Sequence, residues 1–454
     1  MEVIISNNIL VKNASMAVFQ WCRCNLVLDN PEYNTKARLG KWTGGVPQNI
    51  YLYAVKGDDV AIPFGCIRKF HEKFGSECHY TVKFAPIRRL NYVSNIKPYD
   101  YQENAITAVL GIKNGVLVMP CGSGKTQCGL EVIARVGGKA LWLTHTQELL
   151  NQSKKRAQSV LSGVGFGTIT AGKVSIGTHI TFATVQTMCR LDLSEYRHEW
   201  DIIVVDECQH CCGSPTRITQ FYKVVSNLSA RYKLGLTATP YRSDGLEESM
   251  FALLGDVIYE VSREDADICE IRVRQIDTGY APNYDHILTS DGTIDYNRLV
   301  EDLTNDSLRF QYISNTLNAL SGATIVLGNR VEYLQRLCAE YVANGHKAVC
   351  LYSKSDNDMR KRILDELNSG EVDCIFATYQ LAKEGLDVPN LRYVVFATPE
   401  KDQATIIQSA GRVGRQTKGK EFGTVIDFVD DFPLLKKWAR IRRGHYKKIG
   451  AKIL

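Results

Sequence analysis

Between about residues 96 and 431 the chain alternates between short apolar runs and longer segments in which apolar residues recur at helical spacing. Each apolar run ends in a polar or glycine-rich turn. Such runs are typical of strands buried on both faces of a parallel sheet, and the helices between them supply the crossovers. The predicted strands lie at 115–120, 140–144, 179–184, 201–206, 232–239, 323–329, 347–353, 372–378, 392–398 and 423–428.

A less regular stretch at 262–300 separates the two series of strands, so the pattern predicts two tandem α/β domains joined near residue 262. Residues 1–95 have a different texture of short strands and glycine turns. They include a hairpin that turns at Lys56–Asp59. We therefore predict an α/β fold with a small α+β N-terminal domain at 1–95, parallel-sheet domains at 96–262 and 263–434, and a basic tail at 435–454.

The net charge of +6 is unevenly distributed along the chain. Residues 1–95 carry 12 Lys/Arg against 7 Asp/Glu, residues 96–431 carry 35 against 42, and residues 432–454 carry 8 against none. Basic flanks around an acidic body favour a polyanionic partner, although each flank is also compatible with a merely solvated surface. In the tail, Trp438 and Tyr446 are expected to stack on bases while the cations follow phosphates.

The basic residues of the N-terminal segment suggest that it recognises duplex or branched DNA, although it is also compatible with a domain that only supports its neighbour. This segment contains Lys36, Arg38, Lys41 and Trp42. The 14 cysteines are scattered along the chain and fit a reducing cytosol, where cysteine is a small buried residue. No apolar run is long enough to span a membrane, and the first residues do not resemble a secretory signal. The expected location is the cytoplasm, with no membrane partner.

The segment "GVLVMPCGSGKTQCGLEVIARV" places a phosphate-binding turn between a strand and a helix. Gly122 and Gly124 let backbone N–H groups approach phosphate oxygens without interference from a Cβ atom. The helix that follows directs its N-terminal donors at the same anion. Lys125 is expected to reach the β- and γ-phosphates, and the Thr126 hydroxyl to hold Mg²⁺. Met119 occupies the position of the first glycine in the full pattern, so the match is to the shorter "GSGKT" form.

The segment "VVDECQHCCGS" at 204–214 raises a choice between a zinc site and carboxylate chemistry. Zinc needs four ligands, typically from two spaced pairs, and no matching second pair lies nearby in the sequence. Asp206 and Glu207 instead end an apolar strand, where parallel sheets place their ligands. Asp206 is predicted to bind Mg²⁺ and Glu207 to orient and deprotonate the attacking water. Gln209 and His210 are expected to couple the nucleotide to the neighbouring domain.

The sequence resembles the superfamily 2 helicases over about residues 97–431. The resemblance rests on ordered motifs: "KPYDYQ" (97–102), "PCGSGKT" for motif I, "LTHTQELLNQ" (143–152) for Ia, "TFATVQT" (181–187) for Ib, "DECQH" (206–210) for II, "TATP" (237–240) for III, "IVLGNRVEYLQRL" (325–337) for IV, "ATYQLAKEGLDVP" (377–389) for V and "QSAGRVGR" (408–415) for VI. Motifs III and VI are most similar to the DNA-repair branch near XPB and the phage branch-migration helicases. The compact N-terminal segment is most similar to that of a phage-encoded member, which would place the protein in the host cytoplasm.

The resemblance implies two RecA-like domains that share one ATP, with further site residues in the motifs. Arg412 and Arg415 would be arginine fingers and Gln408 would lie near the attacking water. The expected nucleotide contacts are Gln102 as adenine reader, Cys121, Gly122, Ser123, Gly124, Lys125, Thr126, Gly385 and Asp387. The expected nucleic-acid contacts are Thr146, Thr184, Gln186, Asn329, Ser353 and Thr378. Motif Ia departs from many relatives, since it has "THT" at 144–146.

These features predict an ATP- and Mg²⁺-dependent DNA helicase that acts on forked or branched, duplex or single-stranded DNA, with a monomer favoured. A duplex translocase without strand separation remains a second hypothesis, because no strand-splitting hairpin is visible in the sequence. A nucleotide-switched clamp is a third, and RNA is an alternative substrate.

Overall fold

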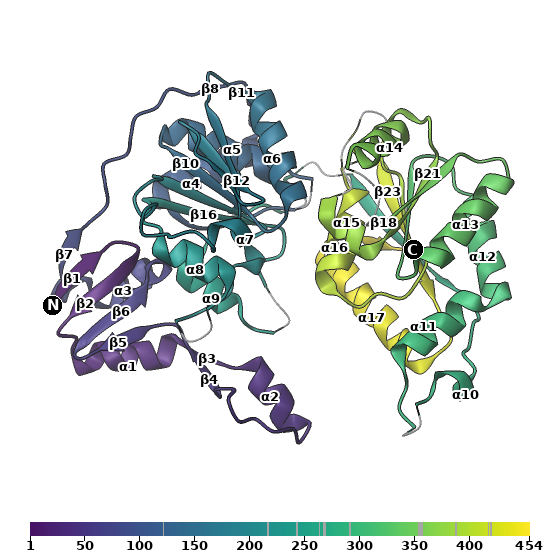
Figure 1. Ribbon diagram of the computed structural model, residues 1–454, viewed down its shortest axis with the longest axis horizontal. Helices are drawn as coiled ribbons and strands as arrows, with labels where there is room; N and C mark the ends of the chain where they lie inside the picture. The colour runs from purple at the N-terminus through teal and green to yellow at the C-terminus, as the bar shows by residue number, and fades with distance from the viewer. Residues whose placement is uncertain are drawn as a thin grey trace. The chain divides into compact units, whose positions relative to one another are not determined.

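The computed structural model describes residues 1–454 except 121, 216–217, 242–243, 263, 267–268, 290–291, 353–356, 386–387, 416 and 418–419. The chain divides into two compact units (Figure 1). Unit 1 comprises Met1–Met119 and Gly124–Ser262, and unit 2 comprises Pro120–Ser123 and Arg263–Leu454. No helix of the described residues is both long and apolar enough to cross a membrane.

Unit 1 begins with a five-stranded sheet whose order is β5-β6-β2-β1-β7. The predicted hairpin is confirmed, because β5 and β6 pair in antiparallel register with Lys56 opposite Asp59. Two further strands and a helix project from this region (Figure 1): β3 (Val27–Asp29), β4 (Asn49–Tyr51) and α2 (Pro31–Arg38). The other elements are β1 (Glu2–Ile5), β2 (Asn8–Lys12), α1 (Met16–Asn25), β5 (Ala54–Lys56), β6 (Asp59–Pro63), η1 (Phe64–Cys66), α3 (Ile67–Phe74), η2 (Gly75–Glu77) and β7 (His79–Val82).

The larger sheet of unit 1 has the order β13-β12-β14-β10-β15-β16-β9-β17, and every neighbouring pair except β12–β13 is parallel. Its strands are β9 (Asn114–Val118), β10 (Ala140–Thr144), β12 (Phe166–Thr170), β13 (Lys173–Ser175), β14 (Ile180–Thr184), β15 (Ile202–Asp206), β16 (Tyr232–Thr237) and β17 (Val257–Glu260). The remaining elements are β8 (Val93–Ser94), β11 (Leu161–Ser162), α4 (Asp100–Ile112), α5 (Lys125–Val136), α6 (Gln147–Val160), α7 (Val185–Met188), η3 (Cys208–His210), α8 (Gln220–Asn227) and α9 (Glu247–Leu254).

The central strands are buried on both faces, as their continuous apolar sequences predict. All five residues of β10, β14 and β15 are buried. The N-terminal sheet shares one hydrophobic core with this sheet, since Val3 and Phe70 belong to the same cluster as Val205 and Leu254. The contact is close at Gly65, where a Cβ atom would lie 2.4 Å from the backbone nitrogen of Gly255. The N-terminal sheet therefore packs against the larger sheet as one body.

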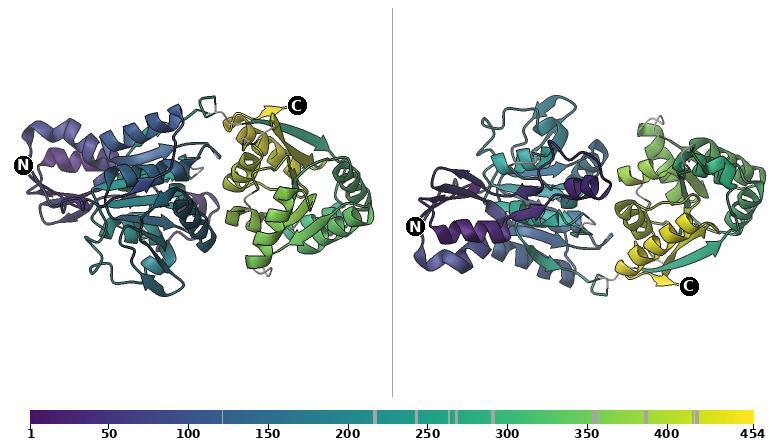
Figure 2. Two further views of the ribbon diagram at one scale, coloured as in Figure 1. Left: turned by 90° about the horizontal axis from the view of Figure 1, so that it is seen from above. Right: turned by 90° about the horizontal axis from the view of Figure 1, so that it is seen from below.

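Unit 2 contains a seven-stranded sheet, β20-β21-β19-β22-β23-β18-β24, in which all neighbouring strands are parallel. Helices cover both faces of this sheet (Figure 2): α13 packs on β19, β20 and β21, whereas α16 and α17 pack on β22 and β23. The strands are β18 (Glu270–Asp277), β19 (Thr324–Gly328), β20 (Ala348–Leu351), β21 (Cys374–Thr378), β22 (Tyr393–Phe396), β23 (Phe422–Val429) and β24 (Lys452–Ile453). The helices are α10 (Tyr284–Ile287), α11 (Tyr296–Asn305), α12 (Ser307–Asn318), α13 (Val331–Ala343), α14 (Asn357–Ser369), α15 (Tyr379–Gly385), α16 (Gln403–Arg412) and α17 (Pro433–Lys448).

The predicted fold class is confirmed: two parallel-sheet α/β domains follow a smaller α+β region. One strand within the stretch that was interpreted as irregular was missed. Strand β18 pairs over its whole length with β23, from Glu270 opposite Phe422 to Asp277 opposite Val429.

The expectation that Trp438 and Tyr446 stack on bases is wrong. The basic tail is largely helix α17, and both rings lie on its buried face. Trp438 is 8% exposed and Tyr446 is fully buried. The rings fill the interior because they recur with Leu435 and Ala439 at helical spacing on the buried side of the helix, where Trp438 packs with Leu299 and Leu303 of α11.

Candidate active site

The carboxyl ends of three neighbouring strands of unit 1 bring the predicted catalytic residues to one edge of the sheet. Strand β16 lies between β15 and β9, with Leu236 opposite Asp206 and Thr237 opposite Val118. The phosphate loop follows β9, the two carboxylates end β15, and "TATP" ends β16. Ligands of open parallel sheets bind at this edge.

The phosphate loop has the backbone that its glycines predict. Gly122 and Gly124 have φ angles of +88° and +85°, which favour glycine. The Ser123 hydroxyl donates to the carbonyl of Pro120 at 2.7 Å, and Lys125 Nζ donates to the carbonyl of Met119 at 3.4 Å. Helix α5 begins at Lys125, so Thr126 lies in its first turn. Cys121 lies outside the described residues.

Gln102 contacts this loop from helix α4. A Cβ atom at Gly124 would lie 2.4 Å from Gln102 Nε2. The side chain is buried, and its Oε1 accepts from the backbone nitrogen of Tyr99 at 3.1 Å. Gln102 therefore caps the start of α4 and touches the phosphate loop, which is a structural role in addition to the predicted reading of adenine.

Asp206 is a buried carboxylate with few protein partners. It accepts from the Ser153 hydroxyl at 3.3 Å and from the backbone nitrogen of Glu207 at 3.1 Å. Burial and the charge of Glu207 raise the pKa of Asp206 to about 6, while the charge of Lys125 opposes this shift. A buried carboxylate beside a threonine-bearing phosphate loop offers the oxygen ligands that Mg²⁺ prefers, and the charge of a bound cation would favour the ionised form of Asp206.

Glu207 adopts a left-handed conformation, with φ 52° and ψ 53°, in which few residues other than glycine are found. Its Oε2 accepts from Gln209 Nε2 at 2.8 Å. Gln209 Oε1 in turn accepts from the buried hydroxyl of Thr237 at 2.7 Å. A relay of two hydrogen bonds thus joins the predicted general base in motif II to motif III on the neighbouring strand.

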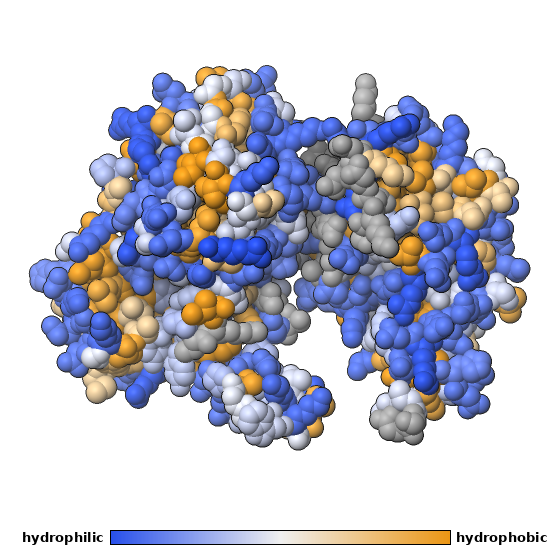
Figure 3. Space-filling view, viewed as in Figure 1, coloured by the Kyte–Doolittle hydropathy of each residue, from blue (hydrophilic) through white to orange (hydrophobic). Residues whose placement is uncertain are grey.

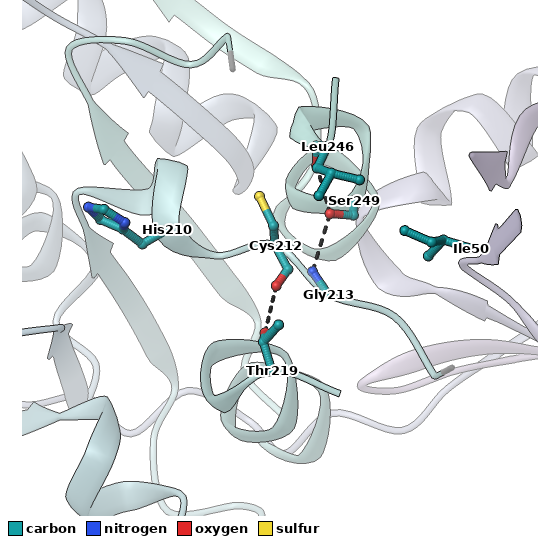
Figure 4. A pocket seen from close by; sticks show the side chains of 7 residues that line it. All are labelled: Ile50, His210, Cys212, Gly213, Thr219, Leu246 and Ser249. Carbon is teal, nitrogen blue, oxygen red and sulfur yellow. Dashed lines mark hydrogen bonds between the residues drawn. The ribbon is translucent and has the colours of Figure 1, made fainter. Parts of the chain in front are cut away.

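The cysteines in and just after motif II pack into the interior. Cys208 and Cys211 are fully buried, and burial raises the pKa of both thiols well above the ordinary value. Within the described part of the chain, no group of three or more metal-binding side chains is assembled. A cavity of about 250 Å³ is lined by Ile50, His210, Cys212, Gly213, Thr219, Leu246 and Ser249. Figure 4 shows the His210 ring pointing away from Cys212.

Three predicted nucleic-acid contacts in unit 1 lie at the ends of β10 and β14, which pair in register from Ala140 to Thr144. The Thr146 hydroxyl accepts from the backbone nitrogen of Leu149 and caps the N-terminus of α6. The buried Thr184 hydroxyl donates to that of Thr187 at 3.1 Å. Gln186 Nε2 donates to the carbonyl of His145 at 2.6 Å. The segments that follow β10 and β14 are therefore joined by a direct hydrogen bond.

In unit 2, the motif VI residues lie on and just after helix α16. Gln408 and Arg412 are half-buried, and Arg412 donates to the carbonyl of Ala382 in α15. Arg415 follows the helix and is half-buried, and its carbonyl accepts from Lys420 Nζ at 3.1 Å. Gly385 ends α15. Asp387 lies outside the described residues.

The predicted nucleic-acid contacts of unit 2 follow neighbouring strands. Asn329 follows β19, and its Nδ2 donates to the Tyr296 hydroxyl at 3.0 Å and to the carbonyl of Pro399 at 3.2 Å. Thr378 ends β21, where its hydroxyl accepts from the backbone nitrogen of Leu381. Ser353 lies outside the described residues.

Two residues of the catalytic edge were absent from the predicted site. Thr237 is the first residue of "TATP", so its position in motif III could have identified it. Ser153 lies in the helix that follows motif Ia, and its sequence context carries no signal for a contact with Asp206. Its role depends on how α6 packs on β10 and β14, which a local pattern does not specify.

Comparisons with known families and proteins extend over most of the chain. Residues 95–242 match the family described as type III restriction enzyme, res subunit, and residues 308–417 match the helicase conserved C-terminal domain. The chain is 26% identical to the DNA 3'-5' translocase XPB2 of Sulfurisphaera tokodaii over 361 residues, which cover 71% of this chain and 79% of the relative. It is 22% identical to the ATP-dependent DNA helicase uvsW of Enterobacteria phage T4 over 458 residues, which cover 92% and 87%. The fold is similar to that of the Pyrococcus furiosus Hef helicase domain, with a TM-score of 0.52, 18% identity, and coverage of 76% and 98%.

Proposed function

The chain belongs to the superfamily 2 helicases, and we propose that it is an ATP-driven motor that moves on DNA and remodels forked or branched duplexes. The observation that supports this most directly is the relay Glu207–Gln209–Thr237 beside the phosphate loop. It connects the group expected to activate water to the strand end that carries motif III. The DNA substrate is proposed because the relatives XPB2 and uvsW are named as a DNA translocase and a DNA helicase.

The phosphate loop is proposed to bind the triphosphate of ATP. Backbone N–H groups around Gly122, Ser123 and Gly124 and the start of α5 would hold the β- and γ-phosphates together with Lys125. Thr126 and Asp206 would hold Mg²⁺, which when bound neutralises phosphate charge. Glu207 would orient the attacking water and take its proton, with Gln209 fixing the direction of the carboxylate.

In unit 2, Arg412 and Arg415 are proposed to act on the γ-phosphate of the same nucleotide, with Gln408 near the water. Arginine side chains that neutralise transition-state charge accelerate phosphoryl transfer by about 10³–10⁵ where measured. Gly385, Asp387 and Cys121 are proposed as further nucleotide contacts.

The nucleic acid is proposed to be held through its backbone, at the loops that follow β10, β14, β19, β20 and β21. The residues assigned to these contacts are Thr146, Thr184, Gln186, Asn329, Ser353 and Thr378. Contacts to phosphates carry no base identity, so this grip suits movement along any sequence. Residues 1–95 are proposed to act as an accessory DNA-binding region beside the first motor domain.

Comparing ATP hydrolysis with single-stranded, duplex, forked and RNA activators tests the substrate class. We expect DNA, and forked DNA above all, to stimulate hydrolysis, and Glu207→Gln to abolish it while ATP still binds. Stimulation by RNA alone would contradict the assignment to DNA. Strand displacement measured beside triplex displacement then distinguishes a helicase from a duplex translocase, because a translocase displaces only the third strand. Full biological activity in Glu207→Gln would instead indicate a nucleotide-switched clamp.

A further inference from the structure

Helix α17 presents an exposed row of positive charge in unit 2. Lys437, Arg440 and Arg443 are exposed, and Lys447 and Lys448 continue the row to the end of the helix. The surface of this part of unit 2 is predominantly hydrophilic in Figure 3. Residues 432–454 contain no acidic residue. None of the three cations Lys437, Arg440 and Arg443 forms an ion pair with any described residue, whereas Lys436 pairs with Asp431 at 2.5 Å.

Three other exposed helices of this chain each pair one cation with a glutamate of the same helix. Lys36 lies 2.9 Å from Glu32 in α2, Arg68 lies 3.4 Å from Glu72 in α3, and Arg362 lies 2.8 Å from Glu366 in α14. Like charges three or four residues apart destabilise a helix by a few tenths of a kcal/mol per pair, and α17 has such pairs without relief. Helix α17 contains no acidic residue, so a counter-charge for these cations has to come from outside the helix.

The helix macrodipole accounts for only part of the row. Cations in the last turn of a helix are stabilised by the macrodipole, and Lys447 and Lys448 lie there. Lys437 lies in the second turn of α17, and Arg440 and Arg443 lie in its middle, where the macrodipole does not stabilise a cation. The inference therefore rests on Lys437, Arg440 and Arg443.

The opposite face of α17 holds the helix rigidly on the sheet. Arg442 is buried and donates to both oxygens of Asp427 in β23, at 2.9 and 3.0 Å. Tyr446 and Trp438 fill the interior beside it. The exposed cations are consequently presented from a fixed support, with Lys437 and Arg443 about 9 Å apart along the axis. Along one strand of a duplex the phosphates advance by about 3.4 Å each, so this spacing matches two to three phosphates.

The buried face at the beginning of α17 is connected to a predicted nucleic-acid contact of the same unit. Asn329 donates to the Tyr296 hydroxyl, and the Tyr296 ring packs on Trp438 with centroids 5.3 Å apart. The exposed Lys401 adds its ammonium 5.2 Å from the centre of the Trp438 ring. The beginning of α17 is thus connected to Asn329 through one intervening side chain.

We propose that the exposed face of α17, with Lys437, Arg440 and Arg443 at its centre, binds the sugar-phosphate backbone of duplex DNA outside the motor motifs. This inference rests on the proposed function, because it extends the path of the DNA beyond Asn329. The contact adds affinity without sequence preference and leaves ATP chemistry unchanged.

The test uses the full chain with the triple substitution K437Q/R440Q/R443Q, since glutamine removes charge but keeps helix propensity. The matched control is K361Q/R362Q on α14, which removes exposed cations from another helix of unit 2. Binding of a fluorescently labelled duplex is measured across a salt series, together with duplex-stimulated ATP hydrolysis. In the triple variant we expect Kd to rise about 10- to 100-fold at low salt and the slope of log Kd against log salt to fall by two to three, about 0.9 for each lost phosphate contact.

The triple variant should also show a raised KM for duplex with an unchanged kcat at saturation, and the control should behave as the unmodified protein. An unchanged Kd and salt slope, with circular dichroism confirming the fold, overturns the proposal. The proposal is also overturned if the triple variant loses binding to anionic vesicles or polyglutamate but keeps its binding to the duplex. The partner of this surface would then be a membrane or an acidic protein. If no nucleic acid stimulates ATP hydrolysis by the unmodified protein, the proposed function itself is wrong.

Discussion

The imidazole rings of His145 and His210 lie with their centroids 4.4 Å apart and their planes inclined by 41°. His210 ends motif II, one residue after the Gln209 that holds Glu207. The carbonyl of His145 accepts from Gln186 in motif Ib. The ring pair therefore joins the segment behind the predicted general base to the loops predicted to hold nucleic acid, and it involves the residue at which motif Ia departs from many relatives.

The His145 ring makes stability sensitive to pH. Burial and the charge of His210 lower the pKa of His145 to about 4, while the charge of Glu207 opposes the shift. Between pH 6.5 and 4 the unfolded chain takes up a proton that the folded protein refuses, so the free energy of unfolding falls as the pH falls through this window. Going from pH 7.5 to 5 removes up to about 2 kcal/mol. Denaturant titrations of His145→Phe, which retains a ring but does not titrate, should show a smaller loss at pH 5. Identical pH profiles for the two proteins would contradict this role.

The hydrogen bonds of Gln209 predict a defect in chemistry rather than in nucleotide binding. Gln209→Leu removes the donor to Glu207 and leaves the buried Thr237 hydroxyl without its acceptor. We expect kcat for ATP to fall about 10- to 100-fold with KM nearly unchanged, because a misdirected base affects the transition state rather than ground-state binding. Thr237→Val should produce a milder form of the same defect.

The double variant of Gln209 and Thr237 provides the control for this relay. Because both changes interrupt one chain of hydrogen bonds, the loss in the double variant should be smaller than the product of the single losses. Strict multiplication of the two effects would show that the residues act independently.

The structural features that were predicted correctly from the sequence are those that depend on local chemistry. Continuous apolar runs predicted strands such as β10 and β15, because burial on both faces excludes polar side chains. The glycines of the phosphate loop predicted its left-handed backbone. Strand β18 was missed because "EIRVRQID" alternates polar and apolar residues within an otherwise irregular region. It becomes a strand by pairing with β23, which is more than 140 residues later in the chain.

The order of the strands in each sheet, and the contacts that depend on it, could not be predicted from local sequence patterns. The bond between Gln209 and Thr237 requires β16 to lie beside β15, and strand order is a property of the whole sheet. The burial of Trp438 had a local signal, since Leu435, Trp438, Ala439 and Tyr446 lie on one face of a helix. The many cations around these residues instead favoured the interpretation of this segment as a tail that binds nucleic acid. Arg442 lies on the same face and is buried because Asp427 accepts its hydrogen bonds.

The ion pair between Arg442 and Asp427 predicts that removing one of the two charges destabilises the protein much more than removing both. Both side chains are almost fully buried, 2.8 Å apart, and the charge of Asp427 holds the pKa of Arg442 above its ordinary value. Asp427→Asn leaves a buried guanidinium without its counter-charge, and we expect the free energy of unfolding to fall by about 3–5 kcal/mol. Arg442→Met combined with Asp427→Leu should recover much of this loss, as chemical denaturation would measure. A double variant no more stable than Asp427→Asn would contradict the electrostatic explanation.

Gln102 caps α4 and contacts the phosphate loop, and it is also predicted to read adenine. Comparing the activity with ATP and with GTP separates the two structural roles from adenine recognition. Gln102→Ala removes the acceptor for the backbone nitrogen of Tyr99, so some stability is lost whichever nucleotide is bound. If the amide also reads adenine, kcat/KM should fall at least tenfold for ATP and much less for GTP, because guanine has a different pattern of donors and acceptors at the same edge. The measurement is the ratio of kcat/KM for the two nucleotides in the unmodified protein and the variant, at a temperature where both remain folded. Equal losses for ATP and GTP would leave Gln102 with a purely structural role beside Gly124.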